Sequence, residues 1–244
     1  MQLIYGVNPV LEGIKRSGDR IKEIIVASGR KGTAIEKILA LASTKSIPVI
    51  FKEKPYLDKV AGGNSHQGIA ALCDSFTYAE VEEIVDNRTE TRDIVLILDG
   101  VTDPQNLGAV IRTAHCLGVR GVIIPENRAV AVTSTVIKAS AGAAHLIPVA
   151  REVNLSRTIE YLKERGFWIY GAEADSGKDL EEFDDAGPVV LALGSEGRGL
   201  RPLIRKKCDF LLSIPMLGKV DSLNVSVAAG IILYEISRKQ VRRK

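Results

Sequence analysis

The apolar run Ile94–Leu98 restricts the fold of this chain more than any other feature. Its residues are continuously apolar rather than alternating, which is typical of a parallel strand buried on both faces. Parallel strands need crossover connections, and stretches with helical spacing separate the later apolar runs. The expected later strands are 121–124, 147–149, 168–172, 188–193 and 210–214, and the expected helices are 107–117, 136–141, 155–165, a short one near Pro202, and 222–238. We therefore predict an α/β domain with five or six parallel strands over residues 94–244.

The first 75 residues predict a second, smaller α/β domain. Its expected strands are 21–27, 48–51 and 69–73, and its expected helices are 5–16, 34–44 and 55–61. Charge separates the two domains, because residues 1–75 carry a net +4, residues 76–93 a net −4 and residues 94–244 a net +3. The acidic stretch 76–93 is predicted to be a linker that contains a connecting helix.

Composition narrows the class of protein. With 244 residues, 45% of them hydrophobic and 26% charged, the chain can bury a substantial core. No segment approaches the roughly 18 consecutive apolar residues of a membrane span, and the start lacks a signal sequence, so we expect a cytoplasmic protein with no membrane partner. Cys73, Cys116 and Cys208 are widely separated, which favours reduced thiols. The histidines lack ligand-like spacing, so no metal is expected.

Two basic clusters, 198–207 and 238–244, have the composition of phosphate-binding segments. Lysine and arginine side chains that neutralise phosphates release counterions, and RNA is the natural polyanion to expect. The alternative for the terminal cluster is a solvated helix end, whose cations favour the negative end of the helix dipole.

A first polar cluster spans residues 98–114, directly after the strand 94–98. Asp103-Pro104 indicates a helix start, which places Asn106 in the first turn and Arg112 about 1.7 turns later. Gly108 would keep one face of this helix open. Asn106 is either a functional residue or a helix cap, and Arg112 either a functional residue or an ion-pair partner of an acid such as Glu196.

A second cluster, residues 192–200, places three glycines in a loop at the end of a strand. Glycine allows close backbone approach and unusual dihedral angles, both useful for holding a ligand through main-chain groups. The spacing Gly-x-x-Gly-x-Gly is neither the dinucleotide fingerprint nor a phosphate loop. Ser195 is not the nucleophile of a Gly-x-Ser-x-Gly elbow, because Leu193 stands two residues before it.

A third cluster, residues 212–230, begins where an expected strand ends at Ile214-Pro215-Met216. Ser222 or Asn224 can cap the helix that follows. The small residues 228–230 let that helix pack closely against a neighbour.

Taken together, the three clusters resemble the SpoU (TrmH) family of RNA ribose 2′-O-methyltransferases, SPOUT enzymes with a deep trefoil knot that use S-adenosylmethionine. The resemblance implies catalytic roles for Asn106, Arg112, Glu196 and Asn224, with Ser226 beside them, and a methyl-donor site made of Leu193, Gly194, Ile214, Met216, Ser222 and Leu223. Ile214, Met216 and Leu223 would enclose adenine and ribose. Because arginine has a pKa above about 12, we expect Arg112 to grip a phosphate and stabilise the developing alkoxide rather than act as the base. Glu196 would orient Arg112, and Asn106 would hold the ribose.

Residues 1–75 also resemble the accessory domain of the family's ribosomal-RNA branch, which is similar to small RNA-binding ribosomal proteins. The resemblance lies in residues 5–10 and 66–70, and it implies a homodimer whose substrate is a guanosine of large-subunit (23S) ribosomal RNA. His66 would contact RNA or, as the more ordinary alternative, serve as a hydrogen-bonded turn residue. The competing functions are a transfer-RNA ribose methyltransferase and a non-catalytic RNA-binding or ribosome-assembly protein. A Rossmann oxidoreductase is disfavoured because the glycine fingerprint is missing after residue 98.

Overall fold

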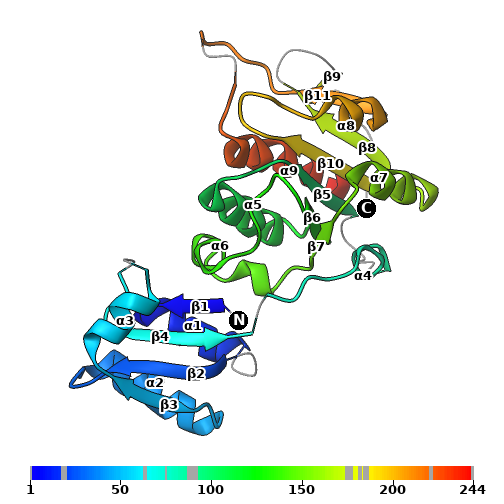
Figure 1. Ribbon diagram of the computed structural model, residues 1–244. Helices are drawn as coiled ribbons and strands as arrows, with labels where there is room; N and C mark the ends of the chain where they lie inside the picture. The colour runs from blue at the N-terminus through cyan, green and yellow to red at the C-terminus, as the bar shows by residue number, and fades with distance from the viewer. Residues whose placement is uncertain are drawn as a thin grey trace. The chain divides into compact units, whose positions relative to one another are not determined.

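The structure is a computed structural model that describes residues 2–17, 21–62, 65–74, 76–86, 93–173, 178–180, 183, 187–219 and 222–242. The chain divides into two compact units, Met1–Thr77 and Tyr78–Lys244 (Figure 1). Both units are α/β, which confirms the predicted fold class. No helix among the described residues is long and apolar enough to cross a membrane.

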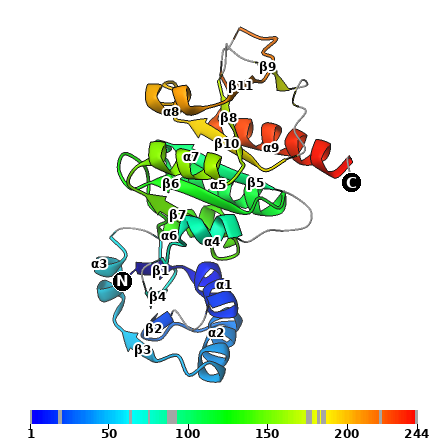
Figure 2. The same cartoon turned by 90° about the vertical axis from the view of Figure 1, so that its right-hand side faces the viewer.

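The first unit is a four-stranded sheet with helices on both faces. Its elements are β1 (Gln2–Tyr5), α1 (Val7–Ser17), β2 (Ile21–Ala27), α2 (Thr33–Thr44), β3 (Val49–Lys52), α3 (Lys54–Val60) and β4 (Ile69–Cys73). The sheet order is β1-β4-β2-β3, and β4 runs antiparallel to both of its neighbours. Figure 2 shows α1 and α2 on one side of this sheet and α3 on the other. Ile14, Ile24 and Ile38 are fully buried on the first side, and Leu57 of α3 packs on the second.

The predicted helix 5–16 begins later than expected, because strand β1 precedes it. Gly6 has a φ of 96°, a conformation that glycine adopts easily, and it turns the chain from β1 into α1. Leu3 then pairs with Leu72 at the edge of the sheet. A strand of four residues is too short for its alternation to be recognised in the sequence.

The second unit contains a seven-stranded sheet in which every described strand pair is parallel. Its elements are α4 (Val81–Asp86), β5 (Ile94–Asp99), α5 (Pro104–Cys116), β6 (Gly121–Pro125), α6 (Ser134–Ala139), a 3-10 turn (Ala143–His145), β7 (Val149–Glu152), α7 (Leu155–Glu164), β8 (Trp168–Ala172), β9 (Lys178–Asp179), β10 (Val189–Gly194), α8 (Pro202–Lys207), β11 (Phe210–Ser213) and α9 (Val225–Arg242). The two-residue strand β9 accounts for the difference from the predicted five or six strands.

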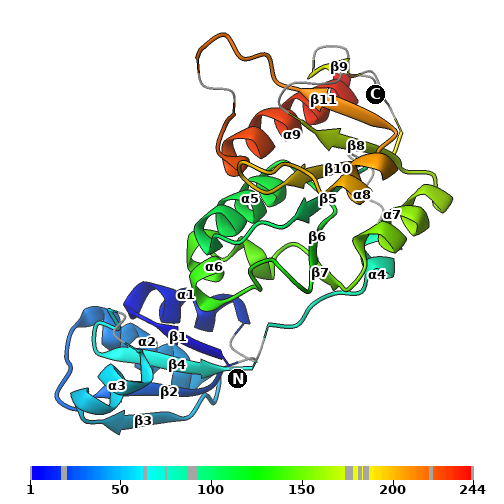
Figure 3. The same cartoon turned by 45° about the horizontal axis from the view of Figure 1, so that its top comes forward.

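Strand order places the predicted polar clusters next to one another. The order is β7-β6-β5-β10-β8-β11-β9, so β10 lies between β5 and β8 although it comes later in the chain. All six residues of β5 are buried, as expected for a central strand. Figures 1 and 3 show α5, α6 and α9 on one face of this sheet and α4, α7 and α8 on the other. The carboxyl ends of β5 and β10 lead into the first two clusters, and the end of β11 leads into the third. The predicted trefoil knot is not tested by strand order and stays a prediction.

The predicted linker 76–93 differs from the structure, because its described residues from Tyr78 onward pack within the second unit. The hydroxyl of Tyr78 accepts a hydrogen bond from the Val132 amide, and Val81 and Ile84 of α4 are buried in the core. The acidic side chains of this stretch obscured its apolar residues, which recur at helical spacing and face inward. The boundary between the two units lies at 77/78.

Arg120 holds the ends of this acidic stretch against the sheet. Its side chain is buried, donates to the Val85 carbonyl and pairs with the carboxylate of Asp93. Its guanidinium also lies 5.5 Å from the centre of the Phe167 ring. Removing one partner from a buried ion pair costs about 3–5 kcal/mol. The stretch is therefore anchored on both sides of residues 87–92, which lie outside the described residues.

Gly108 brings α5 and α6 into close contact. A Cβ atom at this position would lie 2.4 Å from the Ala139 Cβ and 2.9 Å from the backbone nitrogen of Ser140. The sequence predicted that Gly108 would keep one face of this helix open. In the structure the glycine instead lets α6 pack directly against that face. Gly230 of α9 differs, because a Cβ there would meet only Thr113 at an ordinary 3.8 Å.

We expect Gly108→Ala to lower the free energy of unfolding by about 1–3 kcal/mol, because α5 and α6 must separate to admit the methyl group. Gly230→Ala is the matched control, and its better helix propensity should leave stability unchanged or raise it by up to about 1 kcal/mol. Chemical denaturation of both variants checks this. Equal stability of the two variants would contradict the close packing of α5 on α6.

Candidate active site

A cavity of about 440 Å³ lies at the carboxyl ends of the central strands of the second unit. It is lined by Ala172, Glu173, Leu193, Gly194, Ser195, Glu196, Gly197, Gly199, Leu212, Ile214, Met216, Ser222, Leu223, Val225, Ala228 and Ile232. All six residues predicted for the methyl-donor site are in this set. The structure thus brings three distant segments of the chain to one cavity, while the role of each residue stays a prediction.

Sequence reasoning missed part of the cavity wall. Ala172 ends strand β8, Glu173 follows it, and Ala228 and Ile232 lie on α9. No motif marks Ala172, Glu173 or Ile232, and Ala228 was expected only to let its helix pack closely. The position of β8 beside β10 would have indicated the first pair, but strand order is not visible in the sequence.

The glycine-rich loop after β10 folds back on itself. The backbones of Ser195 and Gly199 exchange two hydrogen bonds of 3.1 and 2.9 Å, and Gly197 and Gly199 have φ angles of 76° and 65°. A Cβ at Gly194 would lie 1.9 Å from the carbonyl carbon of Gly199. Glycine at 194 is therefore required by the loop's own closure, and the expected contact of this backbone with a ligand stays a prediction.

Glu196 gathers the polar side chains at the rim of the cavity. Its Oε1 accepts hydrogen bonds from Asn106 Nδ2 at 2.9 Å and Asn224 Nδ2 at 2.6 Å, and from the Val225 amide at 3.4 Å. Asn224 Nδ2 also lies 3.0 Å from Asn106 Oδ1. Three of the four predicted catalytic residues therefore meet in one hydrogen-bonded cluster, and the Glu196 carboxylate is placed at the start of α9, where the helix dipole favours a negative charge.

Helix caps account for the local order around this cluster. Asn224 Oδ1 accepts from the Ser226 amide at 2.9 Å and from the Ser226 hydroxyl at 2.6 Å, so Asn224 is the cap of α9. Asp103 caps α5 by accepting from the Gln105 amide at 2.9 Å. Asn106 is therefore not the helix cap that the sequence left open as an alternative.

Arg112 lies apart from the cluster. It is exposed on α5, six residues after Asn106, which places it about 240° around the helix axis. Among the described residues it makes neither a hydrogen bond nor an ion pair, so the expected contact with Glu196 is not formed. The carboxylate orients two asparagines instead, and Arg112 presents its charge to solvent.

Two family models match consecutive parts of the chain. Residues 3–79 match the model described as RNA 2′-O ribose methyltransferase substrate binding, and residues 93–234 match the SpoU rRNA methylase family. The chain belongs to the SpoU rRNA methylase family. It is an RNA methyltransferase, and the resemblance seen in the three polar clusters is confirmed.

Relatives of this SpoU family member match it over nearly their whole length. A putative TrmH family tRNA/rRNA methyltransferase from Bacillus subtilis is 41% identical over 97% of this chain and 95% of its own. A 23S rRNA (guanosine-2′-O-)-methyltransferase from Pseudomonas putida is 41% identical over 100% and 99% of the two chains. The structure of the SpoU methyltransferase AviRb from Streptomyces viridochromogenes, in complex with the cofactor AdoMet, is 24% identical and covers 98% and 90% of the two chains with a TM-score of 0.79, which shows the same fold.

Asp99 is a buried acid that sequence reasoning did not single out in the SpoU domain. It is 1% exposed at the end of β5 and accepts from the Arg201 amide at 2.9 Å and from Arg201 Nε at 2.6 Å. Two charge-assisted hydrogen bonds offset the cost of its burial. They fix the end of the glycine-rich loop to the strand that leads to Asn106. A carboxylate directly after an apolar strand run was the available signal.

Most cations of the basic cluster 198–207 are paired with acids of the SpoU domain. Arg201 binds Asp99, Arg205 binds Glu173 at 2.8 Å, and Lys207 pairs with Glu160. The hydrogen bond from Lys207 lowers the pKa of Glu160, and the one to Glu173 raises the pKa of Arg205. In the described part of the chain, Arg198 and Lys206 have no carboxylate partner. The predicted phosphate-binding cluster is therefore smaller than its sequence indicates.

Two of the five cations of the terminal basic cluster, Arg238 and Lys239, are engaged within the SpoU domain. Arg238 forms a 2.6 Å ion pair with Glu235 and lowers the pKa of that carboxyl. Lys239 donates to the carbonyls of Leu180 and Phe183 at 3.3 and 2.9 Å. Residues 243 and 244, on which part of the RNA-binding prediction rests, lie outside the described residues.

His66 in the substrate-binding unit is a hydrogen-bonded turn residue, the more ordinary of the two alternatives. It is 6% exposed, its Nε2 lies 2.8 Å from Asp58 Oδ1, and its Nδ1 accepts from the Gly68 amide at 3.1 Å. The hydrogen bond between His66 and Asp58 lowers the pKa of Asp58. Over the described ranges, no group of three or more His, Cys, Asp or Glu residues could hold a metal ion.

We expect Gly194→Ala to reduce methyl transfer more than tenfold, because the added Cβ would drive the loop 195–199 out of the cavity wall. Stability should fall as well, by about 1–3 kcal/mol. Transfer rate and denaturation measured on the same preparation check both effects, with Gly230→Ala as the control glycine. A variant with wild-type transfer and stability would show that the loop tolerates displacement.

Proposed function

We propose that this enzyme transfers a methyl group from S-adenosylmethionine to the ribose 2′-hydroxyl of a guanosine in large-subunit (23S) ribosomal RNA. One observation carries the proposal: Asn106, Glu196 and Asn224 form a hydrogen-bonded cluster at the rim of a cavity. All six residues predicted to bind the methyl donor line this cavity. Relatives from Pseudomonas putida and Pseudomonas aeruginosa, 41% and 42% identical, carry the name of the ribosomal-RNA guanosine enzyme. The substrate-binding match in the first unit supports an RNA substrate.

The cavity suits the proposed methyl donor. Leu193, Ile214, Met216 and Leu223 provide aliphatic walls for an adenosine, and the backbone at Gly194 provides main-chain polar groups. The carboxylate of Glu196 lines the same cavity, and negative charge suits a donor that carries a sulfonium. When bound, S-adenosylmethionine supplies an electrophilic methyl group.

The chain's own residues must position the acceptor ribose. The amides of Asn106 and Asn224 are held by Glu196, so both are oriented before the substrate arrives. Alignment of the reacting groups can supply about 7–11 kcal/mol of a reaction barrier. In our proposal Asn106 holds the ribose, and Arg112, whose charge has no acidic partner among the described residues, grips the adjacent phosphate and stabilises the developing alkoxide.

We further propose that the enzyme is a homodimer that pairs through α9. Val227, Ile231 and Tyr234 recur at positions i, i+4 and i+7 of this helix and are 48%, 39% and 59% exposed. A cavity of about 710 Å³, lined in part by Pro215, Ile231 and Tyr234, borders this stripe. An apolar helix face beside a hollow suits self-association, in which the same surface of a second copy covers it. Free thiols at Cys73, Cys116 and Cys208 fit a cytoplasmic location.

The assay that tests the function offers radiolabelled S-adenosylmethionine with large-subunit ribosomal RNA and, separately, total transfer RNA. We expect labelled 2′-O-methylguanosine in ribosomal RNA only. Label confined to transfer RNA would retain the chemistry and overturn the substrate. Absence of label in both, together with absence of donor binding, would favour a non-catalytic RNA-binding protein.

Arg112→Ala should lower the transfer rate by at least 100-fold while binding of S-adenosylmethionine stays at the wild-type level. The reason is that the exposed guanidinium acts on the acceptor and lies outside the residues that line the donor cavity. Equilibrium dialysis with labelled donor measures binding, and Lys138→Ala serves as a control for loss of positive charge in this unit. Full activity of Arg112→Ala would remove it from the mechanism.

Ile231→Asp should convert the proposed dimer to a monomer, because a charge at the centre of the apolar stripe would be desolvated on pairing. Sedimentation equilibrium at micromolar concentration measures the change. Lys206→Asp, at an exposed position on α8, is the control and should leave the mass unchanged. A monomeric wild type would exclude the dimer.

A further inference from the structure

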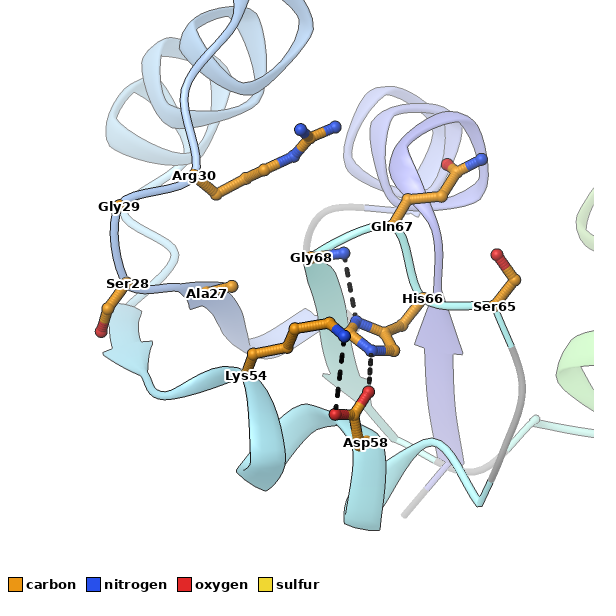
Figure 4. A pocket seen from close by; sticks show the side chains of 10 residues that line it. All are labelled: Ala27, Ser28, Gly29, Arg30, Lys54, Asp58, Ser65, His66, Gln67 and Gly68. Atoms are coloured by element: carbon orange, nitrogen blue, oxygen red, sulfur yellow. Dashed lines mark hydrogen bonds and ion pairs between the residues drawn. The ribbon is translucent and has the colours of Figure 1, made fainter.

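The first unit contains a cavity of about 720 Å³ that belongs to none of the sites described above. It lies between the loop that follows β2, the start of α3 and the turn that precedes β4 (Figure 4). Apart from Ala27 and two glycines, its lining residues are polar or charged, and they include two cations that come from different elements. A hollow of this kind, within a unit that matches an RNA substrate-binding model, calls for a specific occupant.

One wall of the cavity is held in place before any ligand binds. Because His66 Nδ1 accepts from the Gly68 amide, Nε2 carries the proton and donates it to Asp58. His66 is buried, and Gln67 beside it accepts from the Val7 amide at 3.0 Å. Gln67 also has a positive φ of 52°, an uncommon conformation that these contacts maintain. The turn is thus ordered by hydrogen bonds on both sides.

Arg30 is positioned across this turn by the absence of a side chain at Gly68. A Cβ at Gly68, which has a φ of 78°, would lie 3.1 Å from Arg30 Cδ and 3.2 Å from its Cγ. Figure 4 shows the arginine reaching from the β2 loop toward the turn. Its guanidinium forms neither an ion pair nor a hydrogen bond within the described part of the chain, so its donors remain available to a ligand.

Lys54 supplies the second cation from the opposite side of the cavity. It is the first residue of α3, and its Nζ lies 3.9 Å from Asp58 Oδ2, at the limit of an ion pair. Asp58 is already engaged by His66 through its other oxygen, Oδ1. The positive charge of Lys54 is therefore only weakly paired and is available to a ligand. Ser28, Ser65 and Gln67 add side-chain polar groups to the lining.

We propose that this cavity receives one unpaired nucleotide of the RNA substrate, with Arg30 and Lys54 on its phosphates. The inference rests on the proposed function, since it assumes an RNA substrate. A concave site with two cations and several polar groups suits a nucleotide that has left its stack, whereas duplex RNA is bound across a wide, shallow groove. The cavity's volume and its lining by three segments of the chain suit a single nucleotide.

The test measures binding of a fluorescein-labelled single-stranded RNA of 12 nucleotides to the full chain by anisotropy over a series of salt concentrations. Arg30→Ala with Lys54→Ala removes both cations, and both are exposed, so folding should be preserved. We expect weaker binding and a slope of log K against log salt that is smaller by about 1.4, at about 0.7 per phosphate contact on a single strand. Lys37→Ala with Lys59→Ala removes the same charge from the same unit outside the cavity and should change the slope by much less.

Two results would overturn the inference. Equal changes in the two double variants would show that diffuse charge, and not the cavity, binds RNA. Tighter binding of a matched duplex, with the same dependence on Arg30 and Lys54, would exclude an unpaired nucleotide. A methyl-transfer assay separates this inference from the proposed function. The Arg30→Ala, Lys54→Ala variant should raise the KM for RNA with kcat unchanged. If the wild type binds RNA through this cavity but transfers no methyl group, the proposed function is overturned and this inference is not.

Discussion

A single oxygen atom, Oε1 of Glu196, accepts hydrogen bonds from side chains that stand 90 and 28 residues away in the chain. Through it, the first turn of α5, the loop after β10 and the cap of α9 are joined at one point. The three segments follow three different strands, β5, β10 and β11. Positions of the asparagines, and with them the shape of the proposed acceptor site, depend on this carboxylate. The start of α9 adds a favourable helix dipole to the same atom.

Close backbone packing sets the second constraint on the site. Gly108, Gly121 and Gly194 each occupy positions where a Cβ would lie within 3 Å of another atom. At Gly121 the neighbour is Ile84 of α4, at Gly108 it is α6, and at Gly194 it is the returning loop. Because interiors are packed as densely as crystals, none of these contacts can relax cheaply. The acidic stretch, the helix that carries Asn106 and the loop that carries Glu196 are therefore fixed by glycines outside the polar cluster.

Much of this architecture could be predicted from the sequence, and the failures have physical causes. The bounds of β2, β4 and β8 were predicted to the residue, because their apolar runs are bounded by polar or turn residues. Strand β1 was missed because four residues are too few for a pattern. The pairing of Asp99 with Arg201 joins residues 102 positions apart and depends on strand order, which sequence periodicity does not contain. The expected contact of Glu196 with Arg112 failed because α5 turns the arginine away from the asparagine side.

Pairing of the α8 cations has a consequence for how strongly this surface could attract a polyanion. Arg205 and Lys207 present neutral ion pairs to the solvent, so a polyanion that approaches this face must first compete with Glu173 or Glu160. A polyanion attracted by charge alone would gain little from these two cations. Retention then depends on contacts that a particular RNA can make elsewhere. On this segment, attraction of a polyanion would therefore fall mainly to Arg198 and Lys206, whose charges have no carboxylate partner among the described residues.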